Sequence, residues 1–399
     1  MTRKQNDTHF DVLIVGGGLA GLSLSCLLGK TGMRVGCIDA QDPKTQMKAD
    51  ERTTAISYGS QKILDDAGIW NHIGKNICPI EDIEILDGNS PTLLEFLSRD
   101  IGREAFGWIT DNRDLRAAMA KQIKSLKNVQ HIAPAKVQDF EITDEQASVI
   151  LEEGKILTAQ LIVGADGRNS FTREWMDVPT RQWSYNQRAM VCIAGHENPH
   201  GNVAVEHFWP EGPFAILPMC DDNKGNHRSS IVFTEHGPER DSLTKLSDQD
   251  FTLALAARFP ERYGNIKLMS KRFAYPLGLV HAADYIKPRM ALIADAAHGI
   301  HPIAGQGLNL GFRDIKALAS LVSKAHESGE DLGNQDLLQT YQRKRRIDNM
   351  AMVAATDGLN RLFSNNMKSL GFLRKIGLKA VAKIPPAKRF FMKQAMGDA

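Results

Sequence analysis

Residues 10–21 read FDVLIVGGGLAG, and this stretch decides the fold. Its apolar first half, rich in β-branched residues, is typical of a buried parallel strand. Three glycines and then Gly21 follow, and the next residues, LSLSCLLGKTG, have the apolar spacing of a helix that is closed by a glycine. A second apolar run, MRVGCIDA, ends beside Asp39. The sequence therefore predicts a strand–helix–strand unit within about thirty residues.

The glycines after the first strand form a GxGxxG pattern. The first glycine permits a tight turn, the second lets a pyrophosphate approach the backbone, and the third lets the helix pack on the strand. The free N–H groups at the start of the helix favour a phosphate, and an acid at the end of the second strand suits a ribose. The predicted dinucleotide site consists of Gly16, Gly18, Leu19, Ala20, Gly21 and Asp39. This pattern alone does not distinguish FAD from NAD.

Composition and charge exclude several classes of protein. The chain has 399 residues, of which 42% are hydrophobic, and its net charge of +2 gives no reason to expect a nucleic-acid partner. Five cysteines without a CxxC pair favour a reducing compartment over a disulfide framework. The polar N-terminus and the lack of an apolar run of roughly 18 residues predict a cytoplasmic protein without a signal peptide or a membrane span.

Further motifs follow in order along the chain. They are ERTTAIS (51–57), DNRDL (111–115), LIVGADGRNS (161–170), WSYNQ (183–187), FWPEGPFAILP (208–218) and ALIADAAHGIHPIAGQGLNLGFRD (291–314). Together they resemble the single-component FAD-dependent aromatic hydroxylases, which share the fold of p-hydroxybenzoate hydroxylase. The last motif, with WSYNQ and FWPEGPFAILP, is most similar to the UbiH/VisC branch, which hydroxylates polyprenylated phenols on the way to ubiquinone.

The resemblance and the strand pattern together imply the domain organisation. We expect an α/β fold in which a Rossmann-like FAD-binding domain, with the βαβ unit of glutathione reductase, carries an inserted antiparallel β-sheet substrate domain and a helical C-terminus. The expected ranges are 1–75, 101–180 and 276–350 for the discontinuous FAD-binding domain, 76–100 and 181–275 for the substrate domain, and 351–399 for a basic helical tail.

Two acids and two arginines are expected to bind the cofactor. Asp166 and Asp295 each end an apolar strand, where the carboxyl edge of a sheet presents ligand-binding groups. The family aspartate that matches Asp295 binds the ribityl or ribose part of FAD, whereas an isolated acid at such a place is more often a helix N-cap. Arg52 and Arg113 carry guanidinium groups that suit phosphate or ribityl oxygens. Arg116 is interpreted as an exposed helix residue.

The glycine-rich run HPIAGQGLNLG (301–311) opens a helix with unusual backbone freedom. Its backbone N–H groups are suited to stabilise negative charge at a flavin edge, so no catalytic side chain is assigned there. The cofactor-binding residues expected in this run are Gly305, Gly307, Leu308 and Asn309, and the flavin-edge backbone candidates are Pro302, Gly305 and Gln306. His298 and His301 lack nearby acids or cysteines in a metal-binding pattern, so no metal is expected.

The resemblance also implies a mechanism. Reduced FAD would react with O₂ to form a C4a-hydroperoxide, which transfers a hydroxyl group to the phenol ring of a polyprenylated substrate. Only one GxGxxG is present, so NADPH or another electron donor would act transiently. No substrate base is assigned: His207 is interpreted as a packed or surface histidine, and a structural role for Tyr185 and Gln187 stays open. Ala294 departs from the family, in which glycine is frequent before the aspartate.

The tail at 367–399 holds eight lysines and arginines against one acid, Asp398. A basic amphipathic helix binds a membrane surface or a partner protein, or it packs on the protein's own core, and the sequence leaves these readings open. The membrane reading predicts peripheral attachment to the inner face and contact with other proteins of ubiquinone biosynthesis. The functional alternatives are a flavin hydroxylase of another aromatic or lipid-like compound and a non-catalytic FAD-binding accessory protein.

Overall fold

A six-stranded sheet forms the first layer of the molecule, with the strand order β19-β20-β12-β1-β2-β8. The computed structural model describes residues 8–88, 94–209, 212–237, 242–300, 305–363 and 384–397. The strands of this sheet are β1 (Val12–Val15), β2 (Val35–Ile38), β8 (Val129–Ile132), β12 (Leu161–Gly164), β19 (Ile286–Lys287) and β20 (Met290–Leu292). β1 pairs in parallel with β2 and β12, and α1 (Leu19–Lys30) connects β1 to β2, which confirms the predicted βαβ unit.

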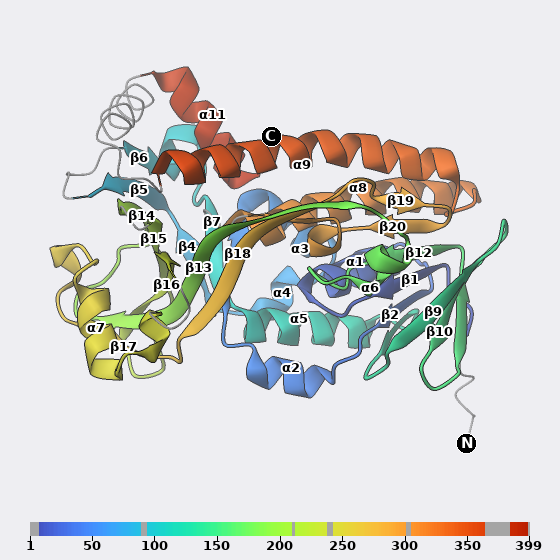
Figure 1. Ribbon diagram of the computed structural model, residues 1–399, viewed down its shortest axis with the longest axis horizontal. Coiled ribbons are helices and arrows are strands. Elements are labelled where there is room, and N and C mark those ends of the chain that lie inside the picture. Colours follow the sequence, from blue (N-terminus) through green and yellow to red (C-terminus); the bar gives the residue numbers. More distant parts are fainter. Residues whose placement is uncertain are drawn as a thin grey trace.

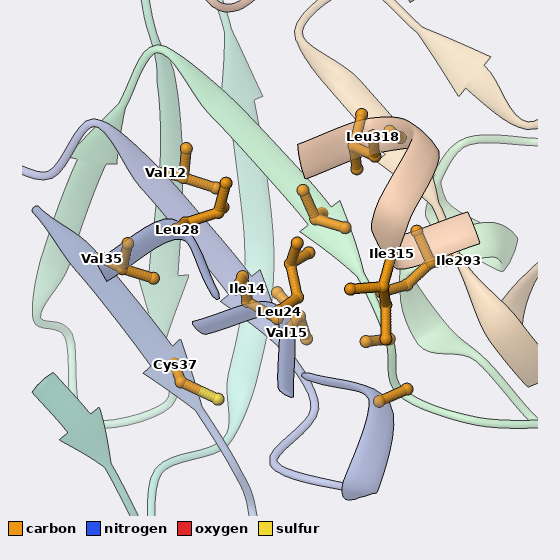
Figure 2. Close-up of a cluster of buried hydrophobic side chains, with 14 of the residues drawn as sticks. Val12, Ile14, Val15, Leu24, Leu28, Val35, Cys37, Ile293, Ile315 and Leu318 are labelled. Carbon is orange, nitrogen blue, oxygen red and sulfur yellow. The ribbon is translucent and has the colours of Figure 1, made fainter. Parts of the chain in front are cut away.

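Helices cover this sheet because its strands are apolar on both faces. Every residue of β1 and β2 is buried, as expected for parallel strands that lie between helices. Figure 2 shows Leu24 and Leu28 of α1 beside the side chains of β1, and Ile315 of α8 (Gln306–Ser328) near Ile293. α1 and α8 thus pack into one apolar core with the sheet. The N-terminus of each helix lies beside this sheet.

The second layer is a nine-stranded sheet, predominantly antiparallel, with the order β21-β18-β13-β16-β15-β14-β5-β6 and with β17 beside β13. Its strands are β5 (Asp82–Asp87), β6 (Leu94–Leu97), β13 (Thr180–His196), β14 (Val203–Trp209), β15 (Gly212–Met219), β16 (His227–His236), β17 (Ile266–Leu268), β18 (Phe273–Ala282) and β21 (His298–Gly299). β13 and β18 pair along most of their length and cross the molecule in Figure 1. The inserted antiparallel sheet is confirmed, and the parallel pairing of β14 with β5 is an addition to the prediction.

The two faces of this large sheet pack against different helices. The first, which we call the α7 face, includes Val205 and Phe214 and packs against α7 (Asp248–Ala256). The second, which we call the α11 face, includes Ala204 and packs against α11 (Pro385–Met396) through Met392 and Met396. Because successive residues of a strand point to opposite faces, each strand supplies side chains to both clusters.

The remaining elements join the two layers. Two small sheets have the orders β3-β7-β4 and β11-β10-β9. Their strands are β3 (Thr53–Ser57), β4 (Ile77–Ile80), β7 (Gly107–Asp111), β9 (Val137–Ile142), β10 (Ala147–Leu151) and β11 (Ile156–Ala159). The other helices are α2 (Pro43–Ala49), α3 (Tyr58–Asp66), α4 (Trp70–Ile73), α5 (Asn112–Ser125), α6 (Phe171–Trp175) and α9 (Gln335–Phe363). β3 and β7 lie between the helices α5 and α8 on one side and the large sheet on the other.

The C-terminal part of the chain is helical where the structure describes it. α9 runs along the top of the molecule in Figure 1 and contains residue 350, where the sequence placed a domain boundary. Residues 364–383, which hold most of the basic tail, lie outside the described residues. No helix in the described part of the chain is both long and apolar enough to cross a bilayer. All five cysteines carry free thiols.

Candidate functional site

The glycines of the GxGxxG pattern divide into two kinds. A Cβ atom at Gly16, whose φ is +111°, or at Gly21 would collide with backbone atoms of Ala165 or of Gly16 itself. Both glycines are therefore required by the protein's own packing. A Cβ atom at Gly18 would have no atom of the described residues within 4 Å. The packing of these residues therefore does not require a glycine at position 18, and the bare backbone leaves room for a ligand.

Asp39 lies at the end of β2, next to a buried histidine. Its carboxylate accepts hydrogen bonds from the backbone N–H of Gln41 at 2.8 Å and from Nε2 of Gln46 at 3.0 Å. A Cβ atom on Gly17 would meet both the Asp39 carboxylate and Nε2 of His131, so these groups surround the glycine-rich turn. Within the described residues, Nε2 of His131 is buried without a hydrogen-bond partner, and burial lowers the pKa of His131. Such an orphaned polar atom fits a polar ligand at this edge.

Arg116 is not an exposed helix residue, and this interpretation from the sequence was wrong. Only 13% of its side chain is exposed, because α5 packs against α1 and α2. Its Nη1 donates to Oε1 of Gln46 at 2.8 Å and to the carbonyl oxygen of Gly17 at 3.4 Å, while Nε donates to Asp50 at 3.3 Å. Arg116 is therefore the arginine that the structure places on the glycine-rich turn.

Arg52 and Arg113, the two arginines that we expected to bind the cofactor, lie away from the glycine-rich turn. Arg52 forms a bidentate ion pair with the buried carboxylate of Asp50, at 2.7 and 3.0 Å. This pairing lowers the pKa of Asp50 against the opposing effect of burial. Arg113 is exposed and lines a polar cavity of about 410 Å³ between α5 and the large sheet. Of the two, only Arg52 is close enough to Asp295 to influence its carboxyl group.

Asp166 follows β12, and its carboxylate forms hydrogen bonds with residues at the start of the next helix, α6. Its carboxylate accepts hydrogen bonds from the hydroxyl group of Ser170 at 2.5 Å, from the backbone N–H of Thr172 at 2.9 Å and from the Thr172 hydroxyl group at 3.0 Å. These bonds hold the first turn of α6. The N-cap residue of α6 is Ser170, and Asp166 supports this first turn through Ser170 and Thr172. Cofactor binding by Asp166 stays a prediction.

Asp295 follows β20 and has no hydrogen bond to any described residue. Its side chain is accessible to solvent, yet the surrounding protein raises the pKa of the carboxyl group by desolvation. The positive charges of His298, Arg168 and Arg52 act against this rise and favour the ionised form. The preceding residue, Ala294, has a φ of +52°, which explains why glycine suits this position. Asp295 is thus an accessible carboxylate at the carboxyl edge of the sheet. No described residue forms a hydrogen bond with it, so its oxygen atoms can accept hydrogen bonds from a ligand.

The start of α8 is anchored to β3 by Asn309. Its side-chain oxygen accepts from the backbone N–H of Ser57 at 2.9 Å, and its amide group donates to the carbonyl oxygens of Ala55 and Gly305, each at 2.9 Å. These contacts fully engage Asn309, so it positions the helix. A Cβ atom at Gly307, as at Gly18, would have no atom of the described part of the chain within 4 Å.

The remaining candidates in HPIAGQGLNLG either lie at the start of α8 or belong to residues that the structure does not describe. Gln306 and Leu308 are half-buried in the first turn of α8, and Leu308 packs against the core of the FAD-side sheet. Gly305, with a φ of +63°, lies against Ala55. Pro302 and His301 belong to residues 301–304, which lie outside the described residues.

A buried polar network lies beneath the start of α8, and it was not predicted from the sequence. Asp314 accepts hydrogen bonds from Nε2 of His298 at 2.5 Å, from Nε of Arg345 at 2.7 Å and from the backbone N–H of Ala294 at 2.9 Å. Asn349 links Asp314 to the Tyr285 hydroxyl group. His298 and Asp314 are fully buried, and their partners hold the pKa of Asp314 below its usual value. The network ties α8 and α9 to the segment that carries Asp295.

Histidines and the WSYNQ motif have structural partners. His207 is buried, and its Nε2 lies 2.7 Å from the carbonyl oxygen of Gly88, which confirms that it is a packed histidine. Gln187 is buried and its amide lies 3.0 Å from a ring nitrogen of His236. Tyr185 packs edge-on against Trp183. The described residues contain no cluster of His, Cys, Asp or Glu that suits a metal ion.

The arrangement as a whole fits a long phosphorylated cofactor. Because β1, β2, β12 and β20 are parallel, their carboxyl ends share one edge, which carries Gly18, Asp39 and Asp295. The N-termini of α1 and α8 follow two of these strands, and each exposes a glycine that no protein atom covers. Helix N-termini favour phosphate and other negative charge, and the acids suit sugar hydroxyl groups.

Comparisons with known proteins agree with this site. The model of the FAD binding domain family matches residues 9–356. Ubiquinone hydroxylase UbiL of Rhodospirillum rubrum is 41% identical over 98% of this chain and 90% of its own length. The 3-demethoxyubiquinol 3-hydroxylase of Escherichia coli is 30% identical over 97% of this chain and 98% of its own. Among solved structures, p-nitrophenol 4-monooxygenase PnpA of Pseudomonas putida is similar in fold, with a TM-score of 0.79, 19% identity and coverage of 97% and 98% of the two chains.

The match to the family model and the similarity to two ubiquinone-pathway hydroxylases over nearly the whole chain define a flavoprotein monooxygenase with FAD as its cofactor. Within this class, the chain belongs to the family of FAD-dependent hydroxylases that includes the ubiquinone hydroxylases. The resemblance of its motifs to that branch is thereby confirmed.

Proposed function

We propose that this protein hydroxylates the ring of a polyprenylated phenol that is a precursor of ubiquinone. The carboxyl edge of the six-stranded sheet carries the proposal, because Gly18 and Gly307 present bare backbone at two helix N-termini and the carboxylate of Asp295 has no hydrogen bond within the described ranges. The similar ubiquinone hydroxylases supply the substrate class. FAD, when bound and reduced, supplies the activation of O₂.

The chain's own residues bind and orient the cofactor. The start of α1, with Gly18 and Arg116, would hold the pyrophosphate, and Asp39 would accept hydrogen bonds from the adenosine ribose. Asp295 would bind hydroxyl groups of the ribityl chain. The backbone N–H groups at Gly305–Asn309 would lie along the pyrimidine edge of the flavin ring, where helix α8 stabilises negative charge. NADPH or another reductant would dock only transiently.

The polyprenyl chain suggests contact with a membrane surface through α11. The inner side of this helix packs into the apolar cluster of the α11 face through Met392 and Met396. Its outer side exposes Phe390 and Phe391, which are 58% and 48% accessible. Arg389 and Lys393, also on α11, are exposed and basic. Exposed aromatic residues beside basic ones are typical of helices that lie in a membrane interface. We propose that α11 guides the prenyl chain from the bilayer towards the site.

The proposed activity is tested by isotope labelling. The FAD-loaded protein is supplied with NADPH, ¹⁸O₂ and a prenylated phenol, and the product is analysed by mass spectrometry. A ring hydroxyl group that contains one ¹⁸O atom is expected. If the flavin is oxidised and reduced but no labelled phenol forms with any prenylated phenol and any reductant, the proposed function is wrong.

Membrane contact is tested with a double variant, Phe390→Ser with Phe391→Ser. The variant is expected to lose most of its binding to vesicles that contain anionic lipids, because the interfacial aromatic side chains are gone. Phe171→Ser removes an exposed aromatic ring from α6 and serves as the control. Equal vesicle binding by the double variant and the wild type would show that α11 is not the contact.

A further inference from the structure

Glu206 is an acid on the large sheet that the description of the site has not used. It lies in the middle of β14, where its neighbours Val205 and His207 point to the opposite, α7 face. Its pairing partners are Ile85 on β5 and Ala215 on β15. Ile85 belongs to the apolar cluster of the α11 face, and Glu206 therefore projects from that same face.

The α11 face is the side of the large sheet that faces the proposed flavin site. Ser230, on this face of β16, has its hydroxyl oxygen 2.5 Å from the hydroxyl oxygen of Thr53 on β3. Ala55, also on β3, packs into the apolar cluster of the α11 face and contacts Gly305 at the start of α8. β3 is thus flanked by the flavin-binding helix and by the sheet face that carries Glu206.

Glu206 has no partner that explains its burial. Within the described ranges, its carboxyl group makes no hydrogen bond or ion pair, and the side chain is half-buried. Burial raises the pKa of the carboxyl group to about 7, and no charged neighbour contributes to the shift. Other titratable or charged groups on elements of this face are Asp87 on β5, Arg228 and His236 on β16, and Lys388, Arg389 and Lys393 on α11. Arg228 is paired with Asp111 at 3.5 Å, and Lys388 with Asp100 at 3.0 Å.

An unpartnered carboxyl group in apolar surroundings lowers stability unless a ligand compensates for it. The surrounding side chains, Ile85 and Ala215, cannot form hydrogen bonds, whereas the proposed substrate carries a phenolic hydroxyl group on an apolar ring. A carboxylate whose directly paired neighbours are apolar matches a ligand that has an apolar ring and one hydrogen-bond donor. This complementarity rests on the proposed function, since the phenol is its substrate.

We propose that the carboxylate of Glu206 binds the phenolic hydroxyl group of the substrate and takes up its proton. The O–H bond of the phenol breaks, the proton moves to a carboxylate oxygen of Glu206, and the bonding electrons stay on the phenol oxygen. Electron density then rises at the ortho and para carbons, which makes the ring a better nucleophile towards activated oxygen. After hydroxylation Glu206 returns the proton to the product oxygen, so the acid is unchanged over one turnover.

The test compares a phenol with an ether that cannot donate a proton. FAD-loaded protein is titrated with ortho-prenylphenol and with its methyl ether, ortho-prenylanisole, and binding is followed by the change in flavin absorbance. At pH 8 the wild type is expected to bind the phenol about ten-fold more tightly than the ether, as for a hydrogen bond to a charged group. Glu206→Gln is expected to lose this preference and to lower kcat for the phenol, and Glu206→Asp to recover part of both.

Glu95→Gln serves as the matched control. Glu95 is an exposed acid on β6, on the opposite face from Leu94 and Phe96 of the apolar cluster, so its removal should leave the preference for phenol unchanged. Phenol binding by the wild type also needs no variant to be informative. Its affinity should rise as the pH increases through about 7, where Glu206 ionises, while the affinity for the ether stays constant.

The results distinguish failure of the role proposed for Glu206 from failure of the proposed function on which that role rests. If Glu206→Gln still prefers the phenol as the wild type does, Glu206 does not contact the hydroxyl group and the inference is wrong. If the wild type binds both compounds equally at every pH, the inference is also wrong, but the proposed function stands. If the wild type binds neither compound and forms no hydroxylated product, the proposed function and the inference fail together.

Discussion

The polar groups beneath the start of α8 differ from those along the carboxyl edge of the six-stranded sheet. Beneath α8, the buried carboxylate of Asp314 accepts hydrogen bonds from His298, Arg345 and a backbone N–H group. At the edge, Asp295 is solvent-accessible and has no hydrogen bond to a described residue. The first carboxylate is satisfied by the protein, and the second is left for a ligand. The hydrogen-bonded carboxylate of Asp314 therefore belongs to the scaffold, and we propose that the carboxylate of Asp295 binds a ligand.

The largest effect is expected when the satisfied region is broken. Asp314→Ala leaves His298 and Arg345 buried without their acidic partner, and the free energy of unfolding should fall by about 3–5 kcal/mol. Urea denaturation of the apoprotein measures this change. Asp65→Ala removes an exposed acid from α3 and should change the value by less than about 0.5 kcal/mol. Equal stability of the two variants would mean that the network does not hold the scaffold.

The glycines at the start of α1 show the same contrast within one motif. Gly21→Ala places a methyl group against the backbone of Gly16 and should lower the free energy of unfolding by about 1–3 kcal/mol. Gly18→Ala adds a methyl group where no protein atom lies within 4 Å, so the apoprotein should change by less than about 0.5 kcal/mol. Thermal unfolding of both apoproteins makes the comparison. A large loss in Gly18→Ala would show that packing, and not a ligand, requires this glycine.

The pH dependence of stability reports on His281, which borders the Asp314 network through Tyr285. Burial, and then the positive charges of His298, Arg346 and Arg181, lower the pKa of His281 from 6.5 to about 4. The unfolded chain therefore binds a proton below pH 6.5 that the folded protein does not bind until about pH 4. The free energy of unfolding should fall by about 1–2 kcal/mol as the pH decreases through this window.

Chemical denaturation at pH 7 and pH 5 measures this effect. His281→Gln cannot take up a proton, so its stability should fall less between the two pH values than that of the wild type. Parallel losses in both proteins would assign the acid sensitivity to other groups.

The smallest expected effect is a gain at Ala294. This residue has a φ of +52°, and its methyl group lies 2.8 Å from the position that a Cβ atom on Gly311 would take, which leaves little room between the turn and α8. Ala294→Gly relieves the left-handed conformation of a residue with a side chain, and the unfolding free energy should rise by about 0.5–1 kcal/mol. Differential scanning calorimetry can detect the corresponding increase in Tm. A decrease would indicate that the methyl group stabilises the turn by packing.

Local patterns in the sequence were sufficient for the fold and for part of the site. The βαβ unit and the inserted antiparallel sheet follow from strand periodicity, and the close packing at Gly16 and Gly21 follows from the spacing of the glycines. The ligand contact at Gly18 stays a prediction. The position of Asp39 at the end of β2 follows in the same way. Such features depend on neighbouring residues in the chain, so the sequence carries them directly.

Features that depend on contacts between distant segments were missed. Arg116 was assigned to the surface because its side chain reaches the glycine-rich turn only after α5 packs beside α1 and α2. Asp314 and Arg345 meet only because α8 and α9 pack together. Glu206 was overlooked beside His207, since the face to which each points depends on the register of β14. No signal in a single sequence sets these contacts, although the alternation along VAVEHFW separates the two residues.

The measurement that tests the account most directly is the titration of apoprotein with FAD, in the wild type and in Gly307→Ala. The account predicts that this variant folds with at least the stability of the wild type, because alanine suits a helix and no atom of the described residues lies within 4 Å of the added methyl group. Its dissociation constant for FAD should rise by about ten-fold or more, since the methyl group would occupy the place that we propose for the flavin. A variant that binds FAD as tightly as the wild type would contradict the location of the flavin site at the start of α8.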